Sequence, residues 1–139
     1  MAWTNCHNFS PELDTESSIP EPSVKSLRDQ IKASDAVIFC TPEYALGMPG
    51  VLKNALDWLV SSGELYGKPT AILSASPLAT GGDKANASLA QTLGVMTAKI
   101  TDKIIIPVVK TKLDAEGNVI DPSLITILRK VIDSLTDFS

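Results

Sequence analysis

The sequence has 139 residues, which fits one domain at most, and 44% of them are hydrophobic, enough to form a core. A net charge of −4, without clustered Lys and Arg, argues against a nucleic-acid partner. The longest apolar run, Ile104 to Val109, is too short to span a bilayer, and no charged and apolar leader opens the sequence. We therefore expect no membrane partner and a cytoplasmic location.

The two cysteines, Cys6 and Cys40, are too few for a disulfide framework. Cys40 lies inside an apolar run, so we expect it to be a small buried side chain. Cys6 is followed by His7, but without further ligands at zinc spacing this pair does not predict a metal site.

The N-terminal residues 1–22 are polar and interrupted by prolines, which predicts an irregular segment. Ser23 could cap a helix that continues to about Ala33. The apolar residues of this helix that face the core are expected to be Val24, Leu27 and Ile31. We thus expect a single domain over 1–139, with its core in 23–139.

A run of five apolar residues, Ala36 to Cys40, follows without alternation and predicts a strand covered on both faces, as in a parallel sheet. Pro42 ends this strand because proline has no amide hydrogen to donate. After Gly50, apolar residues recur at helical spacing: Val51, Leu52, Ala55, Leu56 and Leu59. The polar loop between strand and helix therefore lies at the carboxyl end of the strand, where open α/β sheets bind ligands.

Gly63 is expected to end this helix, and a second buried strand is predicted from Thr70 to Ala75. A loop of mostly small residues follows, and then a helix over about 84–97. The residues of this helix that face the core are expected to be Leu89, Leu93 and Met96.

The third strand is expected over 104–109, at the edge of the sheet, because Pro107 cannot donate to a neighbouring strand. Asp121 is then predicted to cap a last helix with Pro122 at its first position. This helix has a clean apolar stripe: Leu124, Ile127, Leu128, Val131, Ile132 and Leu135. Three strands that alternate with helices predict an α/β domain with a parallel sheet.

TPEY, followed four residues later by PGVLKNALDW, resembles the signature of the NADPH-dependent FMN reductases, which are flavodoxin-like quinone, chromate and azo-type reductases. The resemblance continues through GELYGKPTAILSAS and covers roughly Ser23 to the C-terminus. It implies a flavodoxin-like three-layer α/β/α fold with strand order 2-1-3-4-5. The three strands of this sequence would be the third, fourth and fifth.

The family opens with a strand that runs into a Gly-Ser-x-Arg-x-x-Ser-x-Asn loop, which holds the FMN phosphate. Here all eight glycines lie at Gly47 or later, and neither Arg28 nor Arg129 lies in such a loop. The first strand, the first helix and most of the second strand are therefore expected to be missing. The strand from Ala36 to Cys40 would then form an exposed apolar edge.

The resemblance implies an oxidoreductase with FMN as cofactor and NADPH or NADH as electron donor. It would pass a hydride through FMN to a small-molecule acceptor such as a quinone or a flavin. No catalytic side chain is implied, but seven residues are expected to bind the cofactor: Pro42, Glu43, Tyr44, Ala45, Ser76, Gly81 and Gly82. The family usually has Asn at the position of Ala45. The resemblance also implies a homodimer or homotetramer, with the helix that contains Trp58 near the interface.

The residues leave other interpretations open. Tyr44 could simply be a surface aromatic, Glu43 a solvated carboxylate, and Gly81-Gly82 a plain turn. The missing phosphate loop favours a truncated non-catalytic relative that acts as an interaction or assembly module. A flavodoxin-type electron carrier is a further alternative, which the PGVLKNALDW helix argues against.

Overall fold

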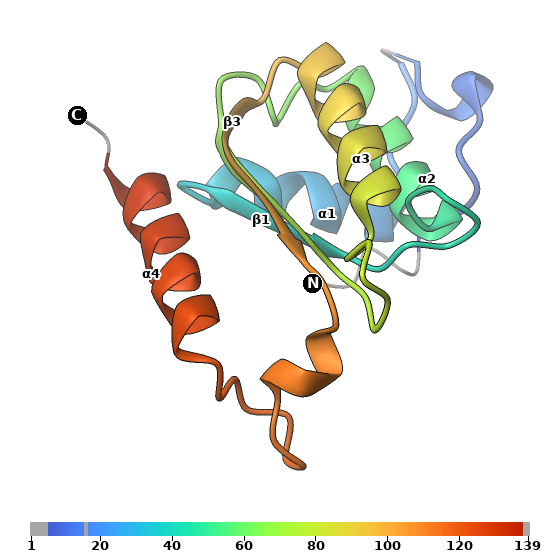
Figure 1. Cartoon of the computed structure of the whole chain (residues 1–139). Helices are drawn as coiled ribbons and strands as arrows, with labels where there is room; N and C mark the ends of the chain where they lie inside the picture. The colour runs from blue at the N-terminus through green and yellow to red at the C-terminus, as the bar shows by residue number, and fades with distance from the viewer. Residues whose placement is uncertain (1–5, 16, 138–139) are drawn as a thin grey trace.

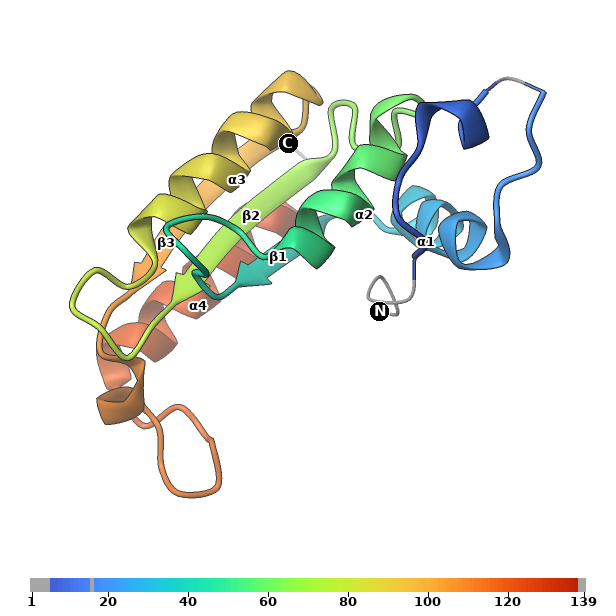
Figure 2. The same ribbon diagram turned by 90° about the vertical axis from the view of Figure 1, so that its right-hand side faces the viewer.

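The computed structural model describes residues 6–15 and 17–137. One parallel sheet has the order β1 (Val37–Thr41), β2 (Pro69–Ala75) and β3 (Lys99–Ile106). The helices are α1 (Pro22–Ala33), α2 (Gly50–Val60), α3 (Asp83–Val95) and α4 (Pro122–Thr136), with two short 3-10 helices, η2 (Pro11–Leu13) and η3 (Val109–Lys112). Helices α2 and α3 lie on one face of the sheet and α4 lies on the other (Figures 1 and 2). The predicted three-layer α/β/α class is confirmed.

Strand β2 lies in the centre of the sheet and is buried on both faces, as predicted. Ile72 packs into the core beneath α2 and α3, whereas Ala71 and Leu73 pack against α4. A side chain on β2 therefore meets a helix whichever way it points, which explains the unbroken apolar pattern of this strand.

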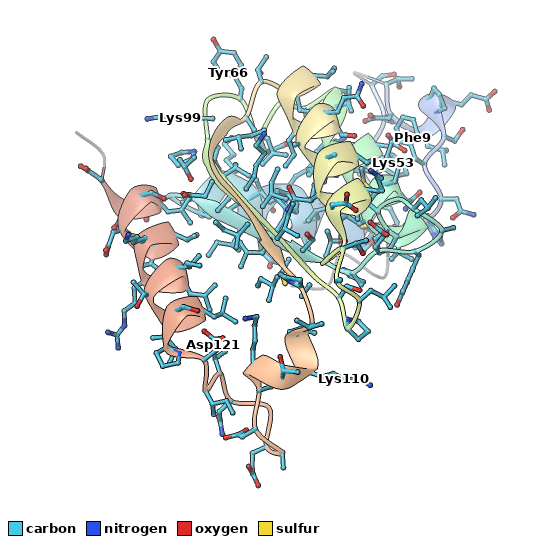
Figure 3. All side chains as sticks on the ribbon, in the orientation of Figure 1. Phe9, Lys53, Tyr66, Lys99, Lys110 and Asp121 are labelled. Carbon is cyan, nitrogen blue, oxygen red and sulfur yellow. The ribbon has the colours of Figure 1, made fainter. Side chains whose placement is uncertain are left out.

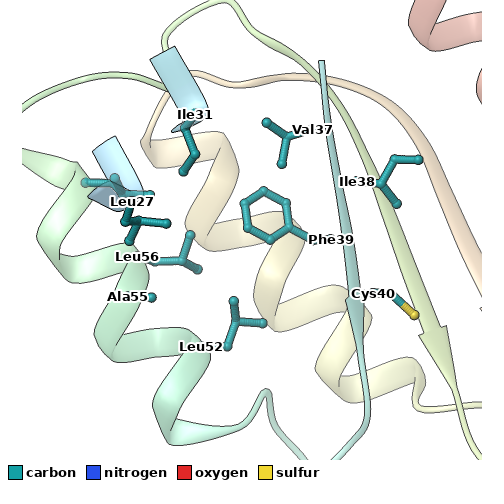
Figure 4. A pocket seen from close by; sticks show the side chains of 10 residues that line it. Leu27, Ile31, Val37, Ile38, Phe39, Cys40, Leu52, Ala55 and Leu56 are labelled. Carbon is teal, nitrogen blue, oxygen red and sulfur yellow. The ribbon is translucent and has the colours of Figure 1, made fainter. Parts of the chain in front are cut away.

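Strand β1 is covered on one face only, so the prediction of a strand covered on both faces was wrong. Val37 and Phe39 point toward α1 and α2, while Ile38 and Cys40 lie on the opposite side of the strand (Figure 4). Helix α4 packs on β2 and β3, and it leaves Ile38 43% exposed and Cys40 exposed as well. Desolvation by its apolar surroundings still raises the pKa of the Cys40 thiol, so the unreactive thiol form is favoured.

The outer edge of β1 is open, as predicted. In the described chain β1 pairs with β2 alone, so one row of its backbone groups has no partner strand. A groove of about 260 Å³ lies between α1, β1 and α2 (Figure 4). In the flavodoxin-like strand order, the first strand lies beside the third, which is the open side of β1.

Helix α1 packs on α2, and a lysine fixes its C-terminal end. Lys68 Nζ donates to the carbonyl oxygens of Ile31 and Ser34, both at 2.6 Å. A cation at a helix C-terminus satisfies carbonyls that have no partner within the helix. The predicted inward face of α1 is confirmed, but the helix begins at Pro22, and Ser23 donates instead to the Glu21 carboxylate.

Strand β3 begins earlier than predicted, at Lys99, and ends at Ile106, so Pro107 follows the strand. Lys99 and Lys103 conceal its first half in the sequence because they interrupt the apolar pattern. Both side chains are exposed (Figure 3 labels Lys99), which an edge strand permits. The predicted edge position is confirmed.

Helix α4 is capped as predicted, because Asp121 Oδ1 accepts a hydrogen bond from Leu124 N at 2.9 Å. Leu124, Val131 and Leu135 are buried against the sheet, and Ile132 is half exposed. None of the helices in the described ranges is long and apolar enough to cross a membrane.

The segment before α1 is irregular, as predicted, but it packs firmly on α2. The Phe9 and Trp58 rings meet edge to face, with centroids 5.1 Å apart, and Trp58 Nε1 donates to the carbonyl oxygen of His7 at 2.9 Å. Asn54 Nδ2 donates to the same carbonyl oxygen at 2.9 Å, and Asn54 Oδ1 accepts from Phe9 N at 2.7 Å. Trp58 is thus buried by a segment of its own chain.

Asp14 ties this segment to both α1 and the end of α2. Its carboxylate accepts hydrogen bonds from Arg28 Nη2 at 2.8 Å and from Ser61 Oγ at 2.6 Å. Partial burial works to raise the pKa of Asp14, but the two hydrogen bonds and the Arg28 charge outweigh it and lower the pKa. A carboxylate with a lowered folded-state pKa stabilises the fold above its unfolded pKa, and this stabilisation is lost as the pH falls through the folded value.

We expect Asp14→Asn to lower the free energy of unfolding by about 1 kcal/mol at pH 7. The difference from wild type should shrink as the pH falls below about 4 and through the lowered folded-state pKa of Asp14, because the protonated carboxyl group carries no charge. Urea denaturation over this pH range measures it. A difference that stays constant with pH would show that the Asp14 charge contributes nothing.

The open edge of β1 should favour self-association, because unpaired strand edges with apolar side chains pair with other chains. We expect Ile38→Lys to reduce concentration-dependent association in sedimentation velocity. Ile132→Lys is the matched control, since Ile132 is also half exposed but lies on α4. Equal effects of the two substitutions would contradict a role for the strand edge.

Candidate functional site

Two loops lie side by side at the carboxyl edge of the sheet (Figure 2). One follows β1 and contains residues 42–49, and the other follows β2 and contains residues 76–82. Their proximity results from the parallel register, in which Thr41 pairs with Ser74 at the ends of the strands. All seven predicted cofactor-binding residues fall in these two loops. The site adjoins the open edge of β1.

The loop after β1 contains a tight turn with an unusual backbone. Tyr44 N donates to Gly47 O at 2.9 Å, and Gly47 N donates to Tyr44 O at 3.0 Å. The two residues between them, Ala45 and Leu46, have φ angles of +48° and +62°. Positive φ at both central positions is typical of type I′ turns, which favour Asn and Gly, so Ala and Leu hold this turn under strain.

This turn exposes an apolar surface. Tyr44 is 65% exposed and Leu46 74%, and Leu78 in the second loop is 65% exposed. The backbone amides of Ala45 and Leu46 have no hydrogen-bond partner within the described residues. Apolar side chains beside free amides suit a flat ring system with carbonyl oxygens at its rim.

The two glycines of the second loop are buried. A Cβ on Gly81 would lie 2.5 Å from the Ile105 side chain and 2.9 Å from Pro107 N. A Cβ on Gly82 would lie 3.2 Å from Ser74 Cβ, and both glycines have positive φ. The packing of the protein itself therefore requires glycine at these positions, independently of any ligand.

Ser76 is also buried and shapes the second loop rather than facing solvent. Its Oγ accepts a hydrogen bond from Leu78 N at 3.1 Å, and its backbone N donates to Ile106 O at 3.2 Å. The exposed residues of this loop are Pro77, Leu78, Ala79 and Thr80. The sequence analysis did not include these four residues among the predicted binding residues. Their position between Ser76 and Gly81, which were included, could have indicated them.

Glu43 does not point into solvent. Its Oε2 accepts hydrogen bonds from the backbone amides of Lys84 at 2.9 Å and Ala85 at 3.1 Å, in the first turn of α3. These amides have no partner within the helix, and a carboxylate also interacts favourably with the helix dipole. The N-terminus of α3 is thereby occupied by a protein anion and does not offer its amides to a phosphate.

The chemistry that these loops can perform is binding and orientation. Within the described residues no three His, Cys, Asp or Glu side chains are grouped as metal ligands. Asp83 and Lys84 form an exposed ion pair at 3.3 Å beside the second loop, where solvent screens the charges. The residues present fit the ring of a flavin, with an aromatic side chain and free amides, better than they fit its phosphate.

The family model of the NADPH-dependent FMN reductases matches residues 5–111. The chain belongs to this family. It is 37% identical over 118 residues to an NAD(P)H-dependent FMN reductase of Pseudomonas aeruginosa, an alignment that covers 82% of this chain and 64% of that one. It is 32% identical over 135 residues to a quinone reductase of Escherichia coli, covering 94% and 71% of the two chains. The chain thus spans less than two thirds of the P. aeruginosa relative.

Solved structures show the same fold. The flavoenzyme FerB of Paracoccus denitrificans, an NAD(P)H:(acceptor) oxidoreductase, superposes with a TM-score of 0.81 at 27% identity, covering 99% of this chain and 76% of that one. An oxidoreductase of Corynebacterium diphtheriae has a TM-score of 0.62 at 18% identity and supports the fold alone. The predicted family and the flavodoxin-like fold are confirmed.

We expect Ala45→Gly to raise the free energy of unfolding by about 1 kcal/mol, because glycine adopts positive φ without the Cβ clash. Thermal or urea denaturation measures the change. The control is Ala115→Gly in another exposed turn, where φ is not positive and added chain entropy should lower the stability slightly. A loss of stability in Ala45→Gly would mean that the turn is unstrained.

Proposed function

We propose that this chain functions as an NAD(P)H-dependent FMN reductase, with the flavin ring held by the loops after β1 and β2. The observation that carries the proposal is the strained turn, which combines the exposed side chains of Tyr44 and Leu46 with the free amides of Ala45 and Leu46. Leu78, in the neighbouring loop, is exposed as well. The turn lies at the carboxyl end of β1, beside its open edge, where flavodoxin-like sheets bind FMN. Family membership over residues 5–111 supports the same assignment.

Bound FMN would supply the chemistry, by accepting a hydride from NADPH or NADH and passing electrons to a quinone- or flavin-type acceptor. Relatives that are named quinone reductases support this class of acceptor. The chain's own residues would bind and orient. The Tyr44 ring offers a stacking surface, and the amides of Ala45 and Leu46 can donate to ring carbonyls. Leu46 and Leu78 would exclude water from the ring.

The seven predicted residues would divide this work between them. Tyr44, Ala45 and Pro42 are exposed and would contact the cofactor directly. The other four are less exposed and would shape the two loops; they are Glu43, Ser76, Gly81 and Gly82. This division of roles is a proposal that ligand titration can test.

A homodimer or homotetramer is part of the proposal. Val51, at the start of α2 beside the first loop, and Val60, at the other end of this helix, are apolar residues that are both more than half exposed. Trp58, on the same helix, is already covered by the N-terminal segment and is not free to contact a partner. The cytoplasmic location stays a prediction.

The first test is a titration of the chain with FMN and with riboflavin, followed by flavin fluorescence. No phosphate cradle is evident among the described residues, so we expect the two dissociation constants to agree within about threefold. Tyr44→Ala should weaken both by about tenfold through loss of stacking. Tyr66→Ala is the control, because Tyr66 is also largely exposed but lies just before β2, at the amino ends of the strands and not at their carboxyl ends (Figure 3).

Oxidation of NADPH by the flavin-loaded chain with a quinone then tests the activity. A folded chain that binds neither flavin would overturn the proposal and favour the non-catalytic interaction module. A strong preference for FMN over riboflavin would instead show that the chain holds the phosphate through residues other than the two loops.

A further inference from the structure

The loop after β1 is held to α3 by one side chain. In the described chain, the two bonds accepted by Glu43 Oε2 are the only hydrogen bonds that link residues 42–48 to an element distant in the sequence. They connect positions 41 and 42 residues apart in the sequence. Every other hydrogen bond of this loop is local, including the pair that closes the turn between Tyr44 and Gly47.

The start of α3, where Glu43 binds, is itself hydrogen-bonded to the sheet. Asn86, one turn into the helix, is buried and donates from Nδ2 to Ser74 Oγ at 3.3 Å and to Ile104 O at 3.0 Å. These bonds fix the start of α3 to both β2 and β3. Gly82, just before the helix, has positive φ, and a Cβ on it would lie 3.5 Å from Glu43 Cβ, so the two loops approach each other closely.

Helix α3 has no cap of its own. Its N-cap residue, Gly82, has no side chain, so the carboxylate of Glu43 satisfies two of the amides that a local Ser, Thr, Asp or Asn would otherwise serve. The helix therefore gains its cap from the same contact that fixes the loop. Removal of the Glu43 carboxylate would free both partners.

We propose that Glu43 is a positioning residue of the flavin site: its carboxylate holds the strained Tyr44–Gly47 turn against α3 and does not touch the ring. The inference rests on the proposed function for its effect on flavin, and on the contacts above for the attachment of the turn. A site held in its binding conformation loses less freedom when the ligand binds, so release of the turn should weaken flavin binding.

A substitution series separates this role from direct contact with the cofactor. Because one oxygen accepts both hydrogen bonds, Glu43→Gln can keep them through its amide oxygen, whereas Glu43→Asp is one methylene too short to reach α3. We expect flavin affinity to decrease in the order Glu, Gln, then Asp and Ala together, with Glu43→Ala weakened about tenfold. If the negative charge acted on the ring itself, Gln would be as weak as Ala.

The matched control is Asp121→Ala, which removes the cap of α4, the helix on the opposite face of the sheet from α3 (Figure 1; Figure 3 labels Asp121). It should lower the melting temperature as Glu43→Ala does but leave flavin affinity unchanged. Amide hydrogen exchange provides a measurement that needs no flavin: Glu43→Ala should speed exchange of the Tyr44 and Gly47 amides, whose hydrogen bonds close the turn, and Asp121→Ala should not.

Unchanged flavin affinity in Glu43→Ala, with a wild-type chain that binds flavin, would overturn the inference. If wild type binds no flavin, the proposed function fails, and the exchange rates alone decide the role of Glu43. Faster exchange of the Tyr44 and Gly47 amides in Glu43→Ala would then support the attachment of the turn, and unchanged exchange would overturn it.

Discussion

The parallel pairing of β1 with β2 is the constraint on which the rest of the structure depends. Because the register places Thr41 beside Ser74, the loop after each strand emerges at the same edge, and each loop then leads into a helix. Glu43 can reach α3 only because these loops are neighbours. The close contact of Gly82 with Ser74 and Glu43 follows from the same register. The strained turn thus follows the carboxyl end of β1 and is held by the N-terminus of α3 through Glu43.

The other edge of β1 explains why the site is open on one side. In a flavodoxin-like sheet FMN binds where the strand order reverses, between the loops of the first and third strands. Here β1 corresponds to the third strand. A groove between α1, β1 and α2 lies along the edge of β1 where the first strand would pair. On the function proposed above, the described chain would supply the ring-facing part of such a site, formed by the loops after β1 and β2. The N-terminus of α3, which a phosphate could otherwise use, is taken by a carboxylate.

Burial made most of the elements predictable from the sequence. The inward residues of α1, the whole of β2 and the Asp121 cap follow from apolar spacing and local hydrogen-bond chemistry. Two failures have physical reasons. The first half of β3 was missed because Lys99 and Lys103, which an edge strand tolerates, interrupt its apolar pattern. Cys40 was wrongly predicted to be buried because an apolar run does not reveal whether a helix covers the second face of the strand. The contact between Glu43 and α3 could not be read from the sequence, since it joins distant segments, and Ala45 gives no sign of positive φ.

The topology also determines how this sheet can form. Neighbouring strands are separated in the sequence by a complete helix, as in the pairing of Val37 with Thr70, so no strand pair can close as a local hairpin. Each ladder requires the ordering of a long loop before it gains any hydrogen bond, and such non-local contacts slow folding relative to helical bundles. Helices α2 and α3 are local and can form first, and their apolar faces can then collect the strands. Because β2 lies between β1 and β3, neither ladder can form without it.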